Sequence, residues 1–185
     1  LVPSSSASQI IANKNILRNA NLSTEFHFNQ VDKQIEDIQN DLKSTGETRL
    51  KHGDFFVTKH SNLSQAHIIF HLVFDDSPVE MNSRHPCILG LRNILKVANR
   101  YDVTQLTIPA LLKNEMSEEM TLSWCLRRAE LILKCTKGFM IESSSTGSEL
   151  STLQLLLPSD ISEELFTSIS QIIPSIFRVA NAKFL

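Results

Sequence analysis

The segment at 66–74, AHIIFHLVF, places the strongest constraint on the fold. It is almost continuously apolar, it is rich in β-branched and aromatic side chains, and an Asp-Asp-Ser-Pro turn follows it. A strand with one face in water alternates apolar and polar residues, whereas a continuous run is typical of a strand covered on both faces. We therefore expect a layered fold in which helices cover both faces of a sheet.

Four segments have the apolar spacing of an amphipathic helix, at 29–43, 86–100, 121–137 and 161–173. Before the last of these, Asp160 and Glu163 form a capping box, which predicts that a helix begins there. Pro174 predicts its end, because proline interrupts helical hydrogen bonding.

Strands are expected at 55–58, 66–74, 103–109, 138–141 and 152–157. The order of strands and helices predicts an α/β fold with three layers, a mixed sheet and helices on both faces. A chain of 185 residues can hold one large domain and an arm. We expect an α/β domain at 51–185 and an N-terminal part at 1–50, whose helix at about 29–43 can pack on that domain.

Charge and cysteine content exclude several classes of protein. The chain has 18 Lys and Arg against 20 Asp and Glu, so it lacks the basic excess of a typical nucleic-acid-binding domain. No apolar run reaches the roughly 18 residues that a membrane-spanning helix needs. Three cysteines without metal-like spacing indicate reduced thiols in a cytosolic protein. The start, Leu-Val-Pro without Met, predicts a fragment of a longer polypeptide.

No motif predicts catalysis, a metal or a cofactor. His67 and His71 are four residues apart, but no third ligand has a suitable spacing. His85 and Cys87 could form a nucleophile pair, although a buried cysteine at a helix start is the simpler interpretation. The five glycines are spread singly, which argues against a glycine-rich cradle for a diphosphate.

A ligand pocket is conceivable at the carboxyl ends of two strands. Asp75 and Asp76 follow the strand at 66–74; Pro109 ends the next expected strand along the chain, and Leu111 follows that strand. Open α/β sheets bind ligands at this edge, and the two acids could hold a cation or a sugar hydroxyl. The alternative is a solvated Asp pair that forms a turn.

A second candidate site is a basic helix surface. Arg127, Arg128, Lys134 and Lys137 all fall within the helix at 121–137. They could contact RNA or an acidic partner. The alternative is a solvated face, on which Lys134 and Lys137 lie near the carboxyl end of the helix, where positive charge interacts favourably with the helix dipole.

Four blocks of the sequence resemble the C-terminal region of the FERRY complex subunit 3 family. They are HSNLSQAHIIFHL from residue 60, GLRNILKVANRYDVTQLTIPALL from residue 90, MSEEMTLSWCLRRAELILKCTKGFM from residue 116 and LQLLLPSDISEELFTSISQIIPSIFRV from residue 153. The resemblance implies a scaffold or adaptor without enzyme activity. It would act in an endosomal Rab-effector complex that carries messenger RNA on early endosomes. The implied partners are the other subunits, with mRNA bound indirectly or weakly. The implied location is cytoplasmic, without membrane insertion.

A second resemblance concerns the fold alone. The helix at 91–95 followed by the strand at 106–110 is similar to a segment of the macro domain. Macro domains bind ADP-ribose through a glycine-rich loop after that strand, whereas 111–115 here reads LLKNE. The resemblance implies a macro-like fold, and the missing glycine argues against ADP-ribose as a ligand. The alternative function is a divergent macro-type domain that binds or hydrolyses a nucleotide ligand.

Overall fold

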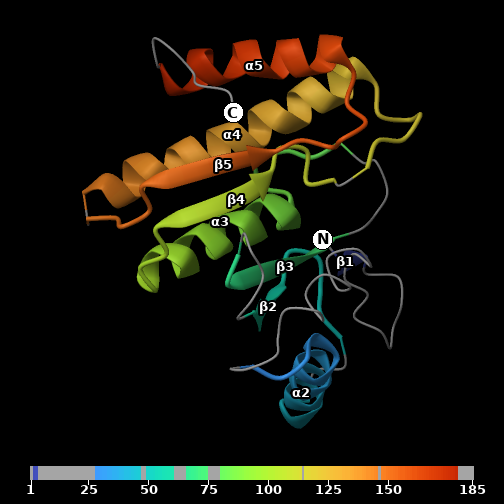
Figure 1. Ribbon diagram of the computed structural model, residues 1–185, viewed down its shortest axis with the longest axis vertical. Coiled ribbons are helices and arrows are strands. Elements are labelled where there is room, and N and C mark those ends of the chain that lie inside the picture. Colours follow the sequence, from blue (N-terminus) through green and yellow to red (C-terminus); the bar gives the residue numbers. More distant parts are fainter. Residues whose placement is uncertain are drawn as a thin grey trace. The chain divides into compact units, whose positions relative to one another are not determined.

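The computed structural model describes residues 2–3, 28–46, 49–60, 66–74, 80–113, 115–145 and 147–178 (Figure 1). Contacts between residues divide the chain into two compact units, Leu1–Ser77 and Pro78–Leu185. The described strands form one sheet in each unit, with the order β1-β3-β2 in the first and β4-β5 in the second.

The first unit is built on an antiparallel pair of strands. β2 (Phe55–Lys59) pairs with β3 (Ile68–Phe74), so that Phe55 lies opposite Leu72. β1 (Val2–Pro3) adds to the other edge of β3 in the parallel direction. The last four residues of β3 are all buried. The apolar segment at 66–74 therefore forms the expected strand, which begins at Ile68.

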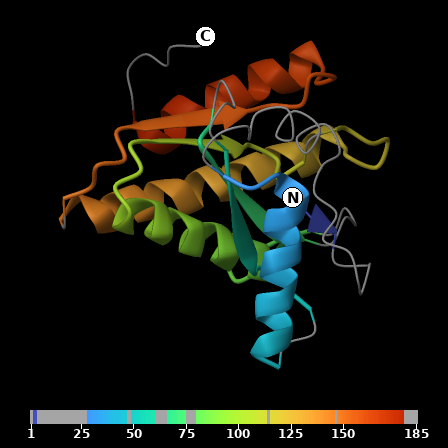
Figure 2. The ribbon, with the colours of Figure 1, turned by 60° about the horizontal axis from the view of Figure 1, so that its bottom comes forward.

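α2 (Val31–Ser44) packs against β2 (Figure 2). Val31 and Ile35 on one face of the helix form a core cluster with Phe56 of β2. The opposite face carries Lys33 with its acidic neighbours. The helix that the sequence placed at about 29–43 thus shares a unit with the first two strands of the domain expected at 51–185. That residues 51–185 form one domain stays a prediction.

The second unit contains a β-α-β crossover. β4 (Gln105–Pro109) leads through α4 (Leu122–Ser144) to β5 (Thr152–Leu156), which pairs with β4 in parallel. Figure 1 shows the two strands side by side and pointing the same way. α4 packs against both α3 (Pro86–Arg100) and α5 (Glu163–Phe177).

These elements confirm the α/β class. The expected single mixed sheet is not what the described strands form: one sheet has three strands of mixed direction and the other has two parallel strands. The three-layer macro-like arrangement stays a prediction.

The expected strand at 138–141 is wrong, because α4 continues to Ser144. The buried residues Thr136, Phe139 and Ser143 keep the helical spacing of three and then four residues, so the buried face of the helix extends past Gly138. A glycine inside a helix costs about 1 kcal/mol relative to alanine. Burial of the Phe139 side chain contributes about 2 kcal/mol and offsets that cost.

The boundaries of the last helix also differ from expectation. Ser162, not Asp160, is the N-cap: its side chain accepts a hydrogen bond from the Leu165 amide at 3.2 Å. Asp160 instead accepts the Met116 amide at 3.2 Å. Pro174 lies inside α5, which continues to Phe177 because the last turn buries Ile176.

Candidate functional site

The four basic residues predicted as a surface on α4 do not form one exposed patch. Arg127 and Lys134 are seven residues apart and share the outward face. Each is exposed and has an acidic partner: Arg127 lies 2.5 Å from Glu80, and Lys134 lies 2.7 Å from Glu130. Both positive charges are therefore compensated within the chain.

Lys137 serves the structure of the second unit. Its Nζ donates a hydrogen bond to the carbonyl oxygen of Ile176 at 2.5 Å. That oxygen is among the last carbonyls of α5, which have no partner within the helix. A cation there also interacts favourably with the helix dipole. The side chain thus ties α4 to the end of α5.

Arg128 is buried, with 3% of its surface exposed. Its guanidinium lies over the Trp124 ring, 4.4 Å from the ring centre, and Nη1 lies 2.9 Å from the Met81 sulfur. Burial lowers the pKa of Arg128 to about 10, so the group remains charged at neutral pH. Attraction between a cation and an aromatic face is strongest where water is excluded. This residue therefore belongs to the packing of α4.

A small hollow adjoins this pair. Its volume is about 30 Å³ and it is lined by Glu80, Met81, Trp124, Arg127 and Arg128. A space of that size holds water molecules, whereas pockets for small organic ligands have volumes of a few hundred Å³ or more. The hollow is therefore a surface irregularity beside the N-terminal part of α4.

The predicted pocket edge is described only in part. Asp75 and Asp76 lie outside the described residues. Pro109 ends β4 and is half-buried. Leu111 is fully buried in a core cluster with residues of α4 and α5, so its side chain has no surface to offer a ligand. A ligand site at this edge stays a prediction.

The first unit contains a buried polar cluster that the sequence analysis missed. Thr58 of β2 lies between two histidine rings: its Oγ1 is 2.9 Å from Nε2 of His60 and 2.7 Å from Nε2 of His71. All three side chains are buried. The ring of Phe56 stacks on that of His71 at 4.5 Å. The signal was present in the sequence, because His60 directly follows β2 and is two residues from Thr58, and alternate residues of an extended chain point to the same side.

The hydrogen-bond network assigns the protons of this cluster. Both Nε2 atoms contact one hydroxyl, which can donate only one hydrogen bond, so at least one of the rings donates to Thr58. Nδ1 of His60 is buried without a hydrogen-bond partner. A buried N–H without an acceptor is rarer than a buried lone pair without a donor. His60 therefore carries its proton on Nε2 and donates to Thr58, which leaves the Thr58 hydroxyl able to donate to Nε2 of His71.

Burial keeps both rings neutral. It lowers the pKa of His60, and it lowers the pKa of His71 to about 3, with a smaller contribution from the charge that His60 would carry. His67 does not join the cluster: its side chain is exposed, while its backbone oxygen accepts the His60 amide at 2.7 Å. The structure thus does not bring the His67–His71 pair together as ligands.

The cysteines have structural surroundings. His85 is the N-cap of α3 and its Nδ1 accepts the amide of Cys87 at 3.3 Å, so the ring contacts the backbone of Cys87. Cys125 is buried and Cys135 half-buried, and burial raises the pKa of both thiols. Within the described part of the chain, no group of three or more His, Cys, Asp and Glu residues could hold a metal ion.

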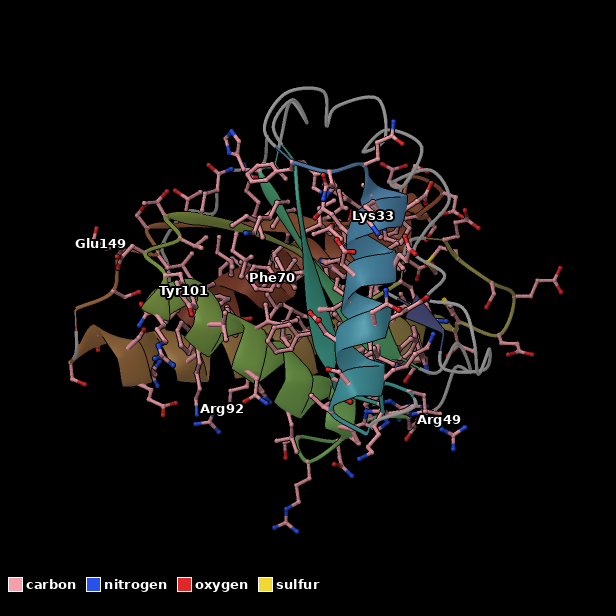
Figure 3. The ribbon with its side chains drawn as sticks, turned by 90° about the horizontal axis from the view of Figure 1, so that it is seen from below. Lys33, Arg49, Phe70, Arg92, Tyr101 and Glu149 are labelled. Atoms are coloured by element: carbon pink, nitrogen blue, oxygen red, sulfur yellow. The ribbon has the colours of Figure 1, made fainter. Side chains whose placement is uncertain are left out.

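The outward face of α3 carries positive charge. After Pro86 in its first turn, the exposed residues of α3 are Leu89, Arg92, Asn93, Lys96 and Arg100. Arg92 lies 2.7 Å from Glu142 of α4 and lowers the pKa of that carboxyl. Figure 3 shows Arg92 on the outer side of α3 and Tyr101 at the end of the same helix.

Comparison with known proteins gives the family. The family model described as "Ferry endosomal RAB5 effector complex subunit 3" matches residues 43–183, about three quarters of the chain. This chain belongs to the FERRY subunit 3 family. The resemblance carried by the four sequence blocks is thereby confirmed.

Curated relatives named FERRY endosomal RAB5 effector complex subunit 3 include proteins of Rattus norvegicus, Mus musculus and Homo sapiens. Each is 42% identical over 85% of this chain. The matched region covers 35% of each relative, so the chain spans about a third of their length.

In this FERRY subunit 3 family member, the matched region begins at the end of α2 and includes every strand from β2 to β5. The histidine cluster and the outward faces of α3 and α4 therefore all lie within the family region. None of the described helices is long and apolar enough to cross a membrane.

Proposed function

We propose that this chain is a binding domain within a subunit of an endosomal RAB5-effector complex, and that it contributes surfaces to assembly rather than chemistry. The observation that carries the proposal is the 42% identity to relatives that are named as subunit 3 of such a complex. Its partners are the other subunits. It works as a scaffold on the cytoplasmic side of early endosomes.

The surroundings of the polar side chains favour a structural role. Arg128 stacks on Trp124, Lys137 bonds the end of α5, and the two buried histidines share the Thr58 hydroxyl. Groups that catalyse reactions usually lie in a cleft beside the substrate. Any role in transport of messenger RNA on endosomes then follows from membership of the complex, with RNA contacted through other subunits.

The test is reconstitution of the complex with the full-length subunit and with a form that lacks this region. We expect the full-length subunit to elute with the other subunits in size-exclusion chromatography, and the shortened form to elute separately or to leave the complex incomplete. Equal incorporation of both forms would overturn the proposal. A shortened form that aggregates is replaced by one in which an unrelated domain of similar size fills the gap.

Calorimetry with ADP-ribose tests the alternative macro-type function on the same preparation. We expect no heat of binding from the full-length subunit. Saturable heat with a defined stoichiometry would favour the ligand-binding alternative. An isolated phosphate titrated in parallel controls for weak binding of anions to surface cations.

A further inference from the structure

The outward face of α3 differs from the other helix surfaces in its charge. Arg92, Lys96 and Arg100 recur every four residues, and α3 contains no acidic residue at all. All three are exposed. On α2, by contrast, Lys33 lies beside Glu36 and Asp37 and forms ion pairs with both. The helix thus presents three cations in one row.

Only the first cation of the row has an ion-pair partner among the described residues. Arg92 bonds Glu142 at 2.7 Å, and the nearby charge of Lys96 makes a small further contribution to lowering the pKa of that carboxyl. No described carboxylate forms an ion pair with Lys96 or Arg100. The bond between Arg92 and Glu142 shows that a helical glutamate can reach this row.

We propose that the outward face of α3 binds an acidic helix of another subunit of the complex. The inference rests on the proposed function and adds the chemistry of the partner. Carboxylates spaced four residues apart on the partner helix would face Lys96 and Arg100. Leu89, which is 48% exposed at the other end of the row, supplies an apolar contact.

The spacing fits a helix better than an irregular segment. A helix rises 1.5 Å per residue, so successive cations of the row stand about 6 Å apart along α3. Glutamates at every fourth position of a second helix repeat at the same distance. Pairs of opposite charge at the edges of helix–helix contacts set partner choice and orientation.

The charge of the chain favours a protein over RNA. The formal net charge is −2, which weakens attraction to a polyanion. The carboxylate of Glu142 already occupies one end of the row. Tyr101, 70% exposed directly after Arg100, is where an RNA base would stack, and it therefore reports on that competing occupant.

The test uses the reconstituted complex and a carbodiimide, which couples a lysine amine directly to a carboxylate in contact with it. We expect a crosslink from Lys96 to an acidic residue of another subunit. Coupling of Lys134 to Glu130 within α4 provides an internal control, because those groups are 2.7 Å apart. Ultraviolet crosslinking of RNA to Tyr101 is measured on the same complex.

A charge-reversal pair completes the test. K96E with R100E should weaken assembly about tenfold, and the loss should shrink as salt rises. R127E with K134E removes the same charge from α4, where both cations already have acidic partners, and should change assembly less than twofold. Circular dichroism of both variants confirms that they fold.

A Lys96 crosslink to another subunit together with the selective loss supports the proposal. Coupling of Lys96 only to acids of its own chain, RNA crosslinked at Tyr101, or equal losses in both variants would overturn it. If the wild-type subunit does not join the complex at all, the proposed function itself fails.

Discussion

The side-chain amide of Gln34 pairs with both backbone groups of Lys59. Its Nε2 donates to the Lys59 oxygen at 2.9 Å, and its Oε1 accepts the Lys59 amide at 2.9 Å. Gln34 of α2 thus bonds β2 as a neighbouring strand would, because it provides hydrogen-bond partners for the N–H and C=O groups of Lys59, the last residue of this edge strand. This pair joins residues 25 positions apart.

Replacement of Gln34 by alanine should lower the free energy of unfolding by about 1–2 kcal/mol, because it removes the two hydrogen bonds to the Lys59 backbone and a third to the Asn29 oxygen. Urea denaturation followed by circular dichroism measures the change. Asn40→Ala on the same helix is the control, since Asn40 is exposed. Equal losses in the two variants would mean that the pairing adds nothing beyond helix propensity.

Thr58→Val should destabilise the chain by about 2–3 kcal/mol, because it leaves the Nε2 atoms of His60 and His71 buried without their shared partner. Valine has nearly the same shape, so no cavity accompanies the loss. Thr107→Val is the matched control: that hydroxyl bonds Gln154 on an exposed part of the second sheet. A loss below 0.5 kcal/mol for Thr58→Val, as expected of an exposed site, would contradict the buried network.

The histidine cluster predicts a dependence of stability on pH. The folded pKa of His71 is about 3, below its unfolded value of about 6.5, so the unfolded chain binds more protons between these values. The contribution of neutral His71 to the free energy of unfolding is therefore fully present above pH 6.5 and is lost as the pH falls toward 3. The slope approaches about 1.4 kcal/mol per pH unit for one histidine.

Measurement of unfolding free energy at several pH values from 7 to 4 tests this prediction. For His71→Phe, unfolding free energy should change less steeply with pH than for the wild type. The difference should correspond to nearly one proton fewer taken up on unfolding, whatever the absolute stability of the variant. Identical slopes would show that His71 is not buried in its neutral form. His67→Phe is the control, because His67 is exposed.

Arg128→Lys should lower stability by about 1–2 kcal/mol even though the charge is kept. A lysine ammonium is a compact, strongly hydrated charge and cannot lie flat on the Trp124 ring as a guanidinium does. Fluorescence of Trp124, the single tryptophan of the chain, reports the unfolding of the second unit. The exposed Arg127→Lys provides the comparison, and a larger loss there would refute the prediction.

Some of the structure could be predicted from local sequence. The apolar run at 66–74 and the helical spacing at 86–100 predicted β3 and α3 correctly, because a continuous apolar run and a period of three to four residues both depend only on neighbours along the chain. The continuation of α4 through Gly138 was missed, since a short apolar run is equally consistent with a strand and a helix.

The four blocks of sequence determined the family, and periodicity determined the α/β class. Only the tertiary structure decided which polar groups are buried and which face water. Arg127 and Arg128 are adjacent in the sequence, yet Arg127 is exposed beside Glu80 and Arg128 is buried against the Trp124 ring, because a helix turns neighbours to different sides. Thr58 and His71 meet only through the register of β2 and β3, which the pairing of distant segments sets.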